Sequence, residues 1–319
     1  MDLKHPADPK AVDLPKSYSD LPFQQLRIFN VPESAKEVTP VVVVQLYRPN
    51  NYNAFTDTLM RELETAFEMF DIDGRVKVVV LSGYGKMFCA GADLDIGFSK
   101  GLQHTKDNRD GGGRVSLAIH RCRKPTIAAI HGAAVGVGIT MTLPCTIRVA
   151  WENAKIGFVF ARRGLVMEAC SSFFLPKLLG MSKALHLCTT GSVYQANNKL
   201  LDGLFSELLP SPEAVLPRAL ELADEIANNT STVSTNLMRE LMYRGPGSAE
   251  EAHLLDSEVI AGLFGGPDNS EGVKSFKEKR PAKFTANMLD NAPQAYPWWH
   301  ATSTASRPHP KGKNPKPRL

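Results

Sequence analysis

The chain has 319 residues, of which 43% are hydrophobic, and it carries a formal net charge of +4. This length and composition predict a large buried core, alone or with a smaller appended domain. No apolar run approaches the roughly 20 residues needed to span a bilayer, and the first residues lack the apolar stretch of a secretion signal. We therefore expect no membrane span and a protein that remains inside the cell.

The charge is distributed unevenly. Residues 306–319 carry five Lys or Arg residues and no acidic residue, so the rest of the chain is close to neutral. This argues against nucleic-acid binding by the folded part. The five cysteines are odd in number, widely spaced and without a CxxC pair. We therefore expect neither a disulfide framework nor a metal site.

The first expected elements form a strand–helix–strand unit. A continuous β-branched run predicts a strand over residues 41–47 that is covered on both faces. Apolar residues at helical spacing predict an amphipathic helix over residues 56–70, and a second apolar strand follows at 76–82. This order is typical of an α/β fold. Before it, residues 1–22 are rich in Pro, Asp and Lys without a period, and we expect a flexible arm.

A polar, glycine-rich segment follows at residues 99–114 and ends in Gly111, Gly112 and Gly113. Its composition predicts a mobile loop beside a ligand site. Alternating elements are expected after it. The strands are predicted at 126–131, 146–151 and 154–160, and the helices at 115–121, 132–143, 172–179 and 183–189.

Helices alone are expected from residue 212 onward. They are predicted at 214–228, 233–244, 249–263 and 272–278. We therefore predict a core over residues 23–211, a helical second region over 212–290 and a basic tail over 291–319. The apolar faces of the helical region are larger than a lone helix pair needs, which favours a use in oligomer contacts.

Two turns of small residues follow predicted strands. In residues 87–94 the small side chains allow backbone N–H groups to approach a ligand, and Asp93 is expected to cap the helix that follows. Residues 131–138 repeat this pattern and resemble a nucleotide-binding glycine loop only loosely. The first turn alone is equally consistent with an ordinary strand-to-helix connection. A histidine that ends a buried strand, such as His131, is more often a hydrogen-bonded structural residue than a catalytic one. Together the two turns predict an oxyanion hole made of amides at two helix N-termini.

Four motifs occur in an order and spacing that indicate a family. They are Arg48-Pro49 with Asn53-Ala54, Phe88-Cys89-Ala90-Gly91-Ala92-Asp93-Leu94, His131-Gly132-Ala133-Ala134-Val135-Gly136-Val137-Gly138, and residues 275–284. Over about residues 23–285 the chain resembles the crotonase (enoyl-CoA hydratase/isomerase) superfamily. The resemblance implies an α/β spiral of repeated ββα units with a C-terminal helical region. It also implies homotrimers or hexamers that bind acyl-CoA, with no cofactor other than the coenzyme A of the substrate.

The resemblance also implies roles for individual residues. The amides of Ala92 and Val137 would hold the thioester oxygen. Phe276 and Lys279 would reach toward CoA from a late helix, of this subunit or a neighbour, although Lys279 is equally consistent with a solvated surface charge. The residues implied to line the CoA and acyl path are Asn53, Ala54, Ala90, Gly91, Asp93, Leu94, Gly136 and Phe160.

The acids of the site distinguish members of the superfamily. Hydratases use two glutamates, and their positions match Thr140 and Phe160, neither of which transfers protons well at neutral pH. Residues 164–177 instead resemble the peroxisomal Δ3,Δ2-enoyl-CoA isomerases, whose catalytic acid matches Glu168. The implied reaction takes a proton from C2 of a 3-enoyl thioester, holds the enolate in the oxyanion hole and returns the proton at C4.

Glu168 has a structural alternative, because a carboxylate at the start of a helix is also favoured as a cap. As a catalytic base it is expected to be desolvated by Phe160, Val166 and Met167, which would raise its basicity. Two other functions stay open. One is a hydratase or dehydratase of a specialised acyl-CoA in secondary metabolism, and the other is a CoA-binding protein without catalysis.

The final tripeptide, Pro317-Arg318-Leu319, resembles the small-basic-leucine peroxisomal address, with Pro in place of Ser. We therefore expect a peroxisomal protein that binds an import receptor through these residues. The alternative is a basic tail without this role.

Overall fold

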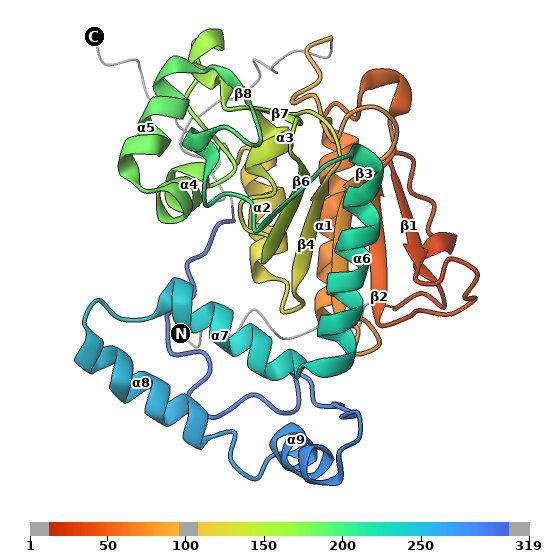
Figure 1. Ribbon diagram of the computed structural model, residues 1–319, viewed down its shortest axis with the longest axis vertical. Coiled ribbons are helices and arrows are strands. Elements are labelled where there is room, and N and C mark those ends of the chain that lie inside the picture. The colour runs from red at the N-terminus through yellow and green to blue at the C-terminus, as the bar shows by residue number, and fades with distance from the viewer. Residues whose placement is uncertain (1–12, 96–107, 306–319) are drawn as a thin grey trace, which may run out of the picture.

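The structure is a computed structural model that describes residues 13–95 and 108–305. Within these ranges the chain forms a mixed α/β core followed by a helical region, so the predicted α/β class is confirmed (Figure 1). The core is built on a six-stranded sheet of order β1-β2-β3-β4-β6-β9 among the described residues. Its strands are β1 (Leu26–Asn30), β2 (Val41–Leu46), β3 (Val78–Gly83), β4 (Thr126–Ile130), β6 (Ile147–Trp151) and β9 (Glu207–Leu209).

Both faces of this sheet are covered, as the continuous β-branched runs predict. β1 pairs antiparallel with β2, and the strands that follow pair in parallel. Val42 and Val44 point toward α1 (Asp57–Ile72) and α2 (Gly111–Arg121), whereas Val41 and Val43 point toward α6 (Pro212–Asn229). In Figure 1, α6 lies in front of the sheet and α1 and α2 lie behind it.

A smaller sheet carries the connections near the site. Among the described residues it joins β5 (Ala134–Val135), β7 (Lys155–Gly157) and β8 (Val193–Gln195). The strand predicted over 154–160 is therefore too long, because the chain turns into a 3₁₀ helix, η4 (Val159–Arg163), after Gly157. The short helix α3 (Val137–Thr140) follows β5, and α4 (Ser171–Leu179) and α5 (Met181–Thr190) come after η4.

The expected arm over residues 1–22 is wrong for its described C-terminal part. Tyr18 is 1% exposed, stacks edge-on against Phe70 and donates a hydrogen bond to Asp73 at 2.9 Å. An aromatic side chain with a satisfied hydroxyl stabilises such packing. Residues 1–12 lie outside the described residues.

The expected loop over residues 99–114 is wrong for its last residues. Gly111, Gly112 and Gly113 form the first turn of α2, because the Asp110 side chain caps this helix by accepting a hydrogen bond from the Gly113 amide. Such a cap offsets the low helix propensity of glycine. Residues 96–107 of the expected loop lie outside the described residues.

The helices after the core extend away from the sheet (Figure 1). They are α7 (Thr232–Arg244), α8 (Ala249–Ala261) and α9 (Pro267–Glu278), and a small cluster around Val233, Leu237, Val259 and Met288 holds them together. A groove of about 820 Å³ runs along them. Among the described residues, none of the helices combines the length and apolar character that crossing a bilayer requires.

Candidate active site

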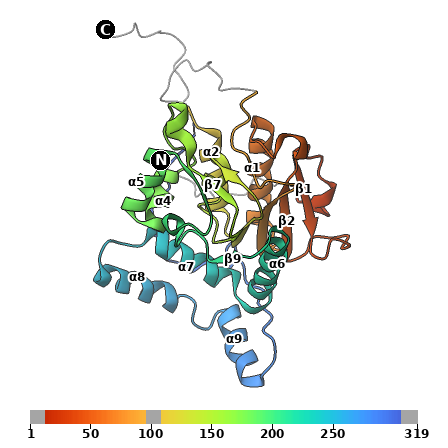
Figure 2. The ribbon, with the colours of Figure 1, turned by 45° about the horizontal axis from the view of Figure 1, so that its top comes forward.

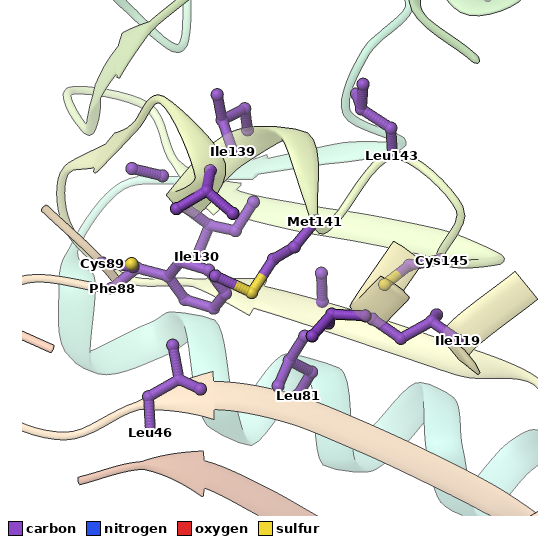
Figure 3. Packing of buried hydrophobic residues seen from close by; sticks show 14 of the residues in the cluster. Leu46, Leu81, Phe88, Cys89, Ile119, Ile130, Ile139, Met141, Leu143 and Cys145 are labelled. Atoms are coloured by element: carbon purple, nitrogen blue, oxygen red, sulfur yellow. The ribbon is translucent and has the colours of Figure 1, made fainter. Parts of the chain in front are cut away.

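The two turns predicted to form an oxyanion hole lie directly against each other. The Cys89 amide donates to the Ala133 carbonyl and the Val135 amide donates to the Cys89 carbonyl, each at 3.1 Å. A Cβ atom on Gly138 would lie 2.4 Å from the Cys89 carbonyl oxygen, so this approach requires glycine. Figure 3 shows Phe88, Cys89 and Met141 packed beneath α3, which anchors both turns on the core.

The two implied oxyanion donors are available. Among the described residues, neither the Ala92 amide nor the Val137 amide donates a hydrogen bond to a protein acceptor. The Val137 amide is at the N-terminus of α3, after Gly136 at φ 56°. Unpaired amides of this kind bind negative oxygen atoms, because they need a partner and carry a partial positive charge.

Asp93 and Asn53 hold the turns together instead of facing a ligand. Asp93 forms an ion pair of 2.9 Å with Arg48, and both side chains are largely buried. No helix that Asp93 caps begins within the described residues, so the expected cap is not seen there. Asn53 is fully buried, accepts from the Arg48 amide and donates to the carbonyls of residues 84, 87 and 88. Its implied place on the CoA path is therefore wrong, because its polar atoms are used inside the fold.

The other residues implied to line the path have different exposures. Gly91 and Gly136 are buried where the two turns meet, and a Cβ atom on Gly91 would lie 2.9 Å from the Val135 carbonyl oxygen. Ala54 is nearly buried, Ala90 is partly buried, and Leu94 is exposed. The surface beside the Ala92 amide is therefore made of small and apolar side chains.

The Glu168 side chain turns toward α3 and does not cap α4. The Thr140 hydroxyl is 2.6 Å from Glu168 Oε1 and donates to it. The contact with α4 is instead made by the Glu168 carbonyl oxygen, which accepts from the Ser171 amide and hydroxyl. Glu168 is thus a carboxyl group beside Val137, and the cap interpretation of its side chain is wrong. Thr140, which the resemblance matches to a hydratase acid, holds Glu168 through its hydrogen bond.

Gly112 of α2 closes the site on the other side of Glu168. A Cβ atom at this position would lie 1.6 Å from Glu168 Oε2 and 3.0 Å from a methyl group of Val137. Glycine at residue 112 therefore leaves the space that the carboxyl group occupies. Gly112 was predicted only as part of a loop beside a ligand site. Asp110 was missed, although an Asp before a helical pattern is a recognised capping signal.

The environment of Glu168 favours its protonated form. Burial raises the pKa of Glu168 to about 8, the Thr140 hydrogen bond opposes this change, and the Asp110 carboxyl group adds to it through charge and a hydrogen bond. A carboxyl group with such a pKa exchanges protons near neutral pH, as general acids and bases do.

The residues expected to desolvate Glu168 do so only in part. Val166 is 82% exposed, which contradicts its expected role, whereas Phe160 and Met167 are partly buried. The polypeptide around Gly112, Val137 and Thr140 supplies the burial instead. The side chain of His131 lies 2.8 Å from the Gly85 carbonyl, in agreement with a structural role.

Phe276 and Lys279 do not join the site within one chain. Phe276 is 85% exposed on α9, and Lys279 is the exposed residue that ends this helix at φ 51°. In Figures 1 and 2, α9 lies at the end of the molecule opposite α2 and β7.

The sequence profile of the enoyl-CoA hydratase/isomerase family matches residues 36–287. Enoyl-CoA hydratase ACTT3 of Alternaria alternata is 47% identical over 277 residues, which cover 86% of this chain and 92% of that protein. A probable enoyl-CoA hydratase of Bacillus subtilis is 30% identical over 246 residues, which cover 76% of this chain and 95% of that protein.

Solved structures give the same result. The crystal structure of a putative enoyl-CoA hydratase from Streptomyces coelicolor is similar with a TM-score of 0.74 and 29% identity, over 86% of this chain and 98% of that one. A probable enoyl-CoA hydratase/isomerase from Mycobacterium abscessus has a TM-score of 0.70 and 30% identity, over 78% of this chain and 96% of that one. With its paired glycine turns and their free amides, the chain belongs to the enoyl-CoA hydratase/isomerase family.

Proposed function

We propose that the protein is an enoyl-CoA isomerase that moves the double bond of a 3-enoyl-CoA to the 2 position. The observation that carries this proposal is the place of Glu168, a carboxyl group of raised pKa held beside the N-terminus of α3. Glutamate is absent at both positions that carry acids in hydratases of this superfamily, which are Thr140 and Phe160 here.

The reaction needs one proton carrier and one site for negative charge. Ionised Glu168 takes a proton from C2, and the C2 electrons form the enolate while the thioester oxygen receives hydrogen bonds from Ala92 and Val137. The Glu168 proton then returns at C4 as the double bond forms between C2 and C3, so the atoms balance without water. Each oxyanion donor contributes roughly 10²–10³-fold to such a rate.

Hydration of a 2-enoyl-CoA is the second candidate function. It is favoured by the names of relatives such as Enoyl-CoA hydratase ACTT3, and by Asp110, which gives the site a second carboxyl group beside Glu168. In this reaction Glu168 would take a proton from a water molecule as its oxygen adds to C3, and the same carboxyl group would then give that proton to C2.

One experiment separates the two candidates. Purified protein is incubated with a 3-enoyl-CoA and with a 2-enoyl-CoA, and the products are separated by liquid chromatography against standards of both isomers and identified by mass spectrometry. Isomerisation leaves the mass unchanged and moves the double bond, whereas hydration adds the mass of water. Conversion of the 3-enoyl-CoA supports the proposal, and hydration of the 2-enoyl-CoA without isomerisation contradicts it.

We also propose that the chain assembles into trimers, or hexamers of paired trimers, through α7–α9. The support is the exposed apolar side chains along these helices and their groove, among them Met242 at 83%, Phe264 at 66% and Phe276 at 85% exposed. Exposed apolar surface of this kind is typical of subunit contacts.

Peroxisomal location is proposed on residues 317–319 alone, which lie outside the described residues. A protein tagged at its N-terminus should collect in peroxisomes and should disperse when these residues are removed. Peroxisomal accumulation that survives the deletion contradicts this proposal.

A further inference from the structure

We propose that Asp110 is a positioning residue that holds the Glu168 carboxyl group in place and acts on its proton. The inference rests on the proposed function, because it takes Glu168 to be the group that transfers a proton. It goes further in assigning a role to a residue from a distant part of the chain.

The first observation is that Asp110 fixes the start of α2. Asp110 Oδ1 accepts a hydrogen bond of 2.5 Å from the Gly113 amide. This cap sets the position of Gly112, whose missing Cβ leaves the space for Glu168 Oε2. Asp110 therefore positions one wall of the space that the carboxyl group occupies.

The second observation is that the same oxygen holds the backbone next to Glu168. Asp110 Oδ1 also accepts from the Ala169 amide at 3.2 Å. Ala169 and Cys170 have φ angles of 57° and 55°, which non-glycine residues adopt only when their surroundings hold them there. The bond from Asp110 thus supports the strained peptide from which the Glu168 side chain leaves the chain.

The third observation is that the two carboxyl groups interact. The Asp110 carboxyl group is held next to Glu168 by its bond to the Ala169 amide, and its charge raises the pKa of Glu168. Asp110 lies on the exposed side, whereas Glu168 is partly buried. The Asp110 charge therefore opposes the loss of the Glu168 proton.

Other titratable groups near Glu168 do not replace Asp110. They are the thiols of Cys89 and Cys170, and burial raises the pKa of both, that of Cys89 to about 12. Both thiols are therefore neutral near pH 7, and the Thr140 hydroxyl carries no charge. Among the described residues that affect the Glu168 proton, Asp110 is the charged one.

A helix cap alone would need only the bond to Gly113. The bond to Ala169 is made by the same carboxylate oxygen, so Asp110 joins residues 110–113 to residues 168–170. Thr140 in turn joins Glu168 to α3. The substitutions Asp110→Asn and Asp110→Ala separate the two functions. Asparagine keeps an oxygen acceptor for both amides and removes the charge, whereas alanine removes both.

The test is the pH dependence of kcat/KM for 3-enoyl-CoA isomerisation. In Asp110→Asn the acid limb should move to lower pH, which raises kcat/KM at acidic pH by about tenfold for each pH unit moved. In Asp110→Ala, kcat should fall by about tenfold to a hundredfold with KM little changed, because Glu168 loses its position. Asp224→Asn, which removes an exposed carboxylate of α6, is the matched control and should keep the wild-type profile.

The outcomes separate this inference from the proposed function. Wild-type profiles for both Asp110 variants, with Glu168→Gln inactive, would overturn the role of Asp110 alone. Activity that survives in Glu168→Gln would overturn the proposed function itself. NMR titration of ¹³C-carboxyl-labelled glutamate, with the Glu168 signal assigned by its loss in Glu168→Gln, follows the same proton without turnover. An unchanged Glu168 titration in Asp110→Asn would also contradict the inference.

Discussion

Glu168 is surrounded by a hydroxyl group, a glycine and a second carboxyl group, with no positive charge among the described groups that act on its proton. Burial without a cation makes ionisation costly, because water no longer solvates the charge. The same surroundings make Glu168 a stronger base than an exposed glutamate. Glu168, which we propose transfers the proton, therefore lowers the stability of the folded protein when it is ionised.

This cost predicts a pH-dependent effect on stability. Burial raises the pKa of Glu168 to about 8 in the folded protein, whereas the unfolded chain has an ordinary glutamate. The folded state therefore binds the Glu168 proton more tightly than the unfolded chain does. This binding stabilises the fold at low pH, and the stabilisation is lost as the pH rises toward 8. Glu168→Gln, which stays neutral, should have a higher Tm than the wild type at pH 9 and a similar Tm at pH 5. Equal Tm differences at both pH values would contradict the raised pKa.

Single residues of the site differ in how far the sequence predicts them. Glu168 follows from resemblance to a motif, and the Ala92 and Val137 amides follow from the two glycine turns. Asn53 was predicted as a ligand contact, because the sequence does not show that its amide group is used by the carbonyls of residues 84, 87 and 88. Asp110 and Glu168 are 58 residues apart in the sequence, and only the packing of the folded chain brings them together.

At the scale of elements, the first turn of α2 is unusual because it is made of glycines. Its position is set by the cap at Asp110, and its Gly112 leaves room for the Glu168 carboxyl group. Glycine lowers helix propensity, so this turn is less stable than one made of other residues. Its missing side chains allow the Glu168 carboxyl group to lie close to the helix.

Gly112→Ala should therefore reduce turnover without unfolding the protein. The added methyl group would displace the Glu168 carboxyl group, and a displacement of about 1 Å costs roughly 10²-fold in rate. Circular dichroism and kcat are the measurements. Gly247→Ala, at an exposed position with no heavy atom within 4 Å of the added Cβ, is the control. A Gly112→Ala protein with wild-type kcat would show that the carboxyl group is not held where the structure places it.

The connections before β3 and after it are joined by the Arg48–Asp93 pair. Arg48 also donates to the Ala54 carbonyl, so one side chain links the turn at residues 48–54 to the turn that carries the Ala92 amide. Arg48→Met removes the cation from a largely buried pair and should destabilise the protein by about 3–5 kcal/mol in urea unfolding. Asp57→Asn, on an exposed first-turn residue of α1, should change the stability little. A loss as small for Arg48→Met as for this control would contradict the structural role of the pair.

The elements themselves follow from the sequence where the hydrophobic pattern is strong. The strands at 41–46 and 78–83 begin with runs of valine, and the helix α1 has a clear apolar face, so all of them were predicted. β1 was not identified as a strand, and the start of α2 was predicted as a loop. At the start of α2 the glycine-rich composition favours a loop, but the cap made by the Asp110 side chain stabilises a helix there.

At the scale of the whole molecule, the site and the last helices lie apart. The two glycine turns and Glu168 lie beside α3, whereas α9 lies at the opposite end of the molecule (Figure 1). Phe276 therefore reaches an acyl-CoA only if it belongs to a neighbouring subunit. The proposed assembly would therefore be needed for Phe276 to take part in the proposed site.

The assembly predicts the mass of the protein in solution. The chain of 34.9 kDa should elute as a trimer or hexamer in size-exclusion chromatography with light scattering. Phe264→Glu combined with Met242→Glu should shift it toward the monomer, because charges would replace apolar side chains in the contact. Leu14→Glu, at an exposed position of the N-terminal segment, is the control. A monomeric wild-type protein would contradict the assembly.

The central claim is that Glu168 transfers the proton at the acyl chain of a CoA thioester. It is tested most directly by the rate of 3-enoyl-CoA isomerisation in Glu168→Gln, with Glu213→Gln on the exposed N-terminal turn of α6 as the matched control. We expect kcat of Glu168→Gln to fall by at least roughly 10²–10⁴-fold while the control keeps wild-type turnover, because glutamine keeps the shape and loses the base. A Glu168→Gln protein that isomerises 3-enoyl-CoA at the wild-type rate would contradict the account.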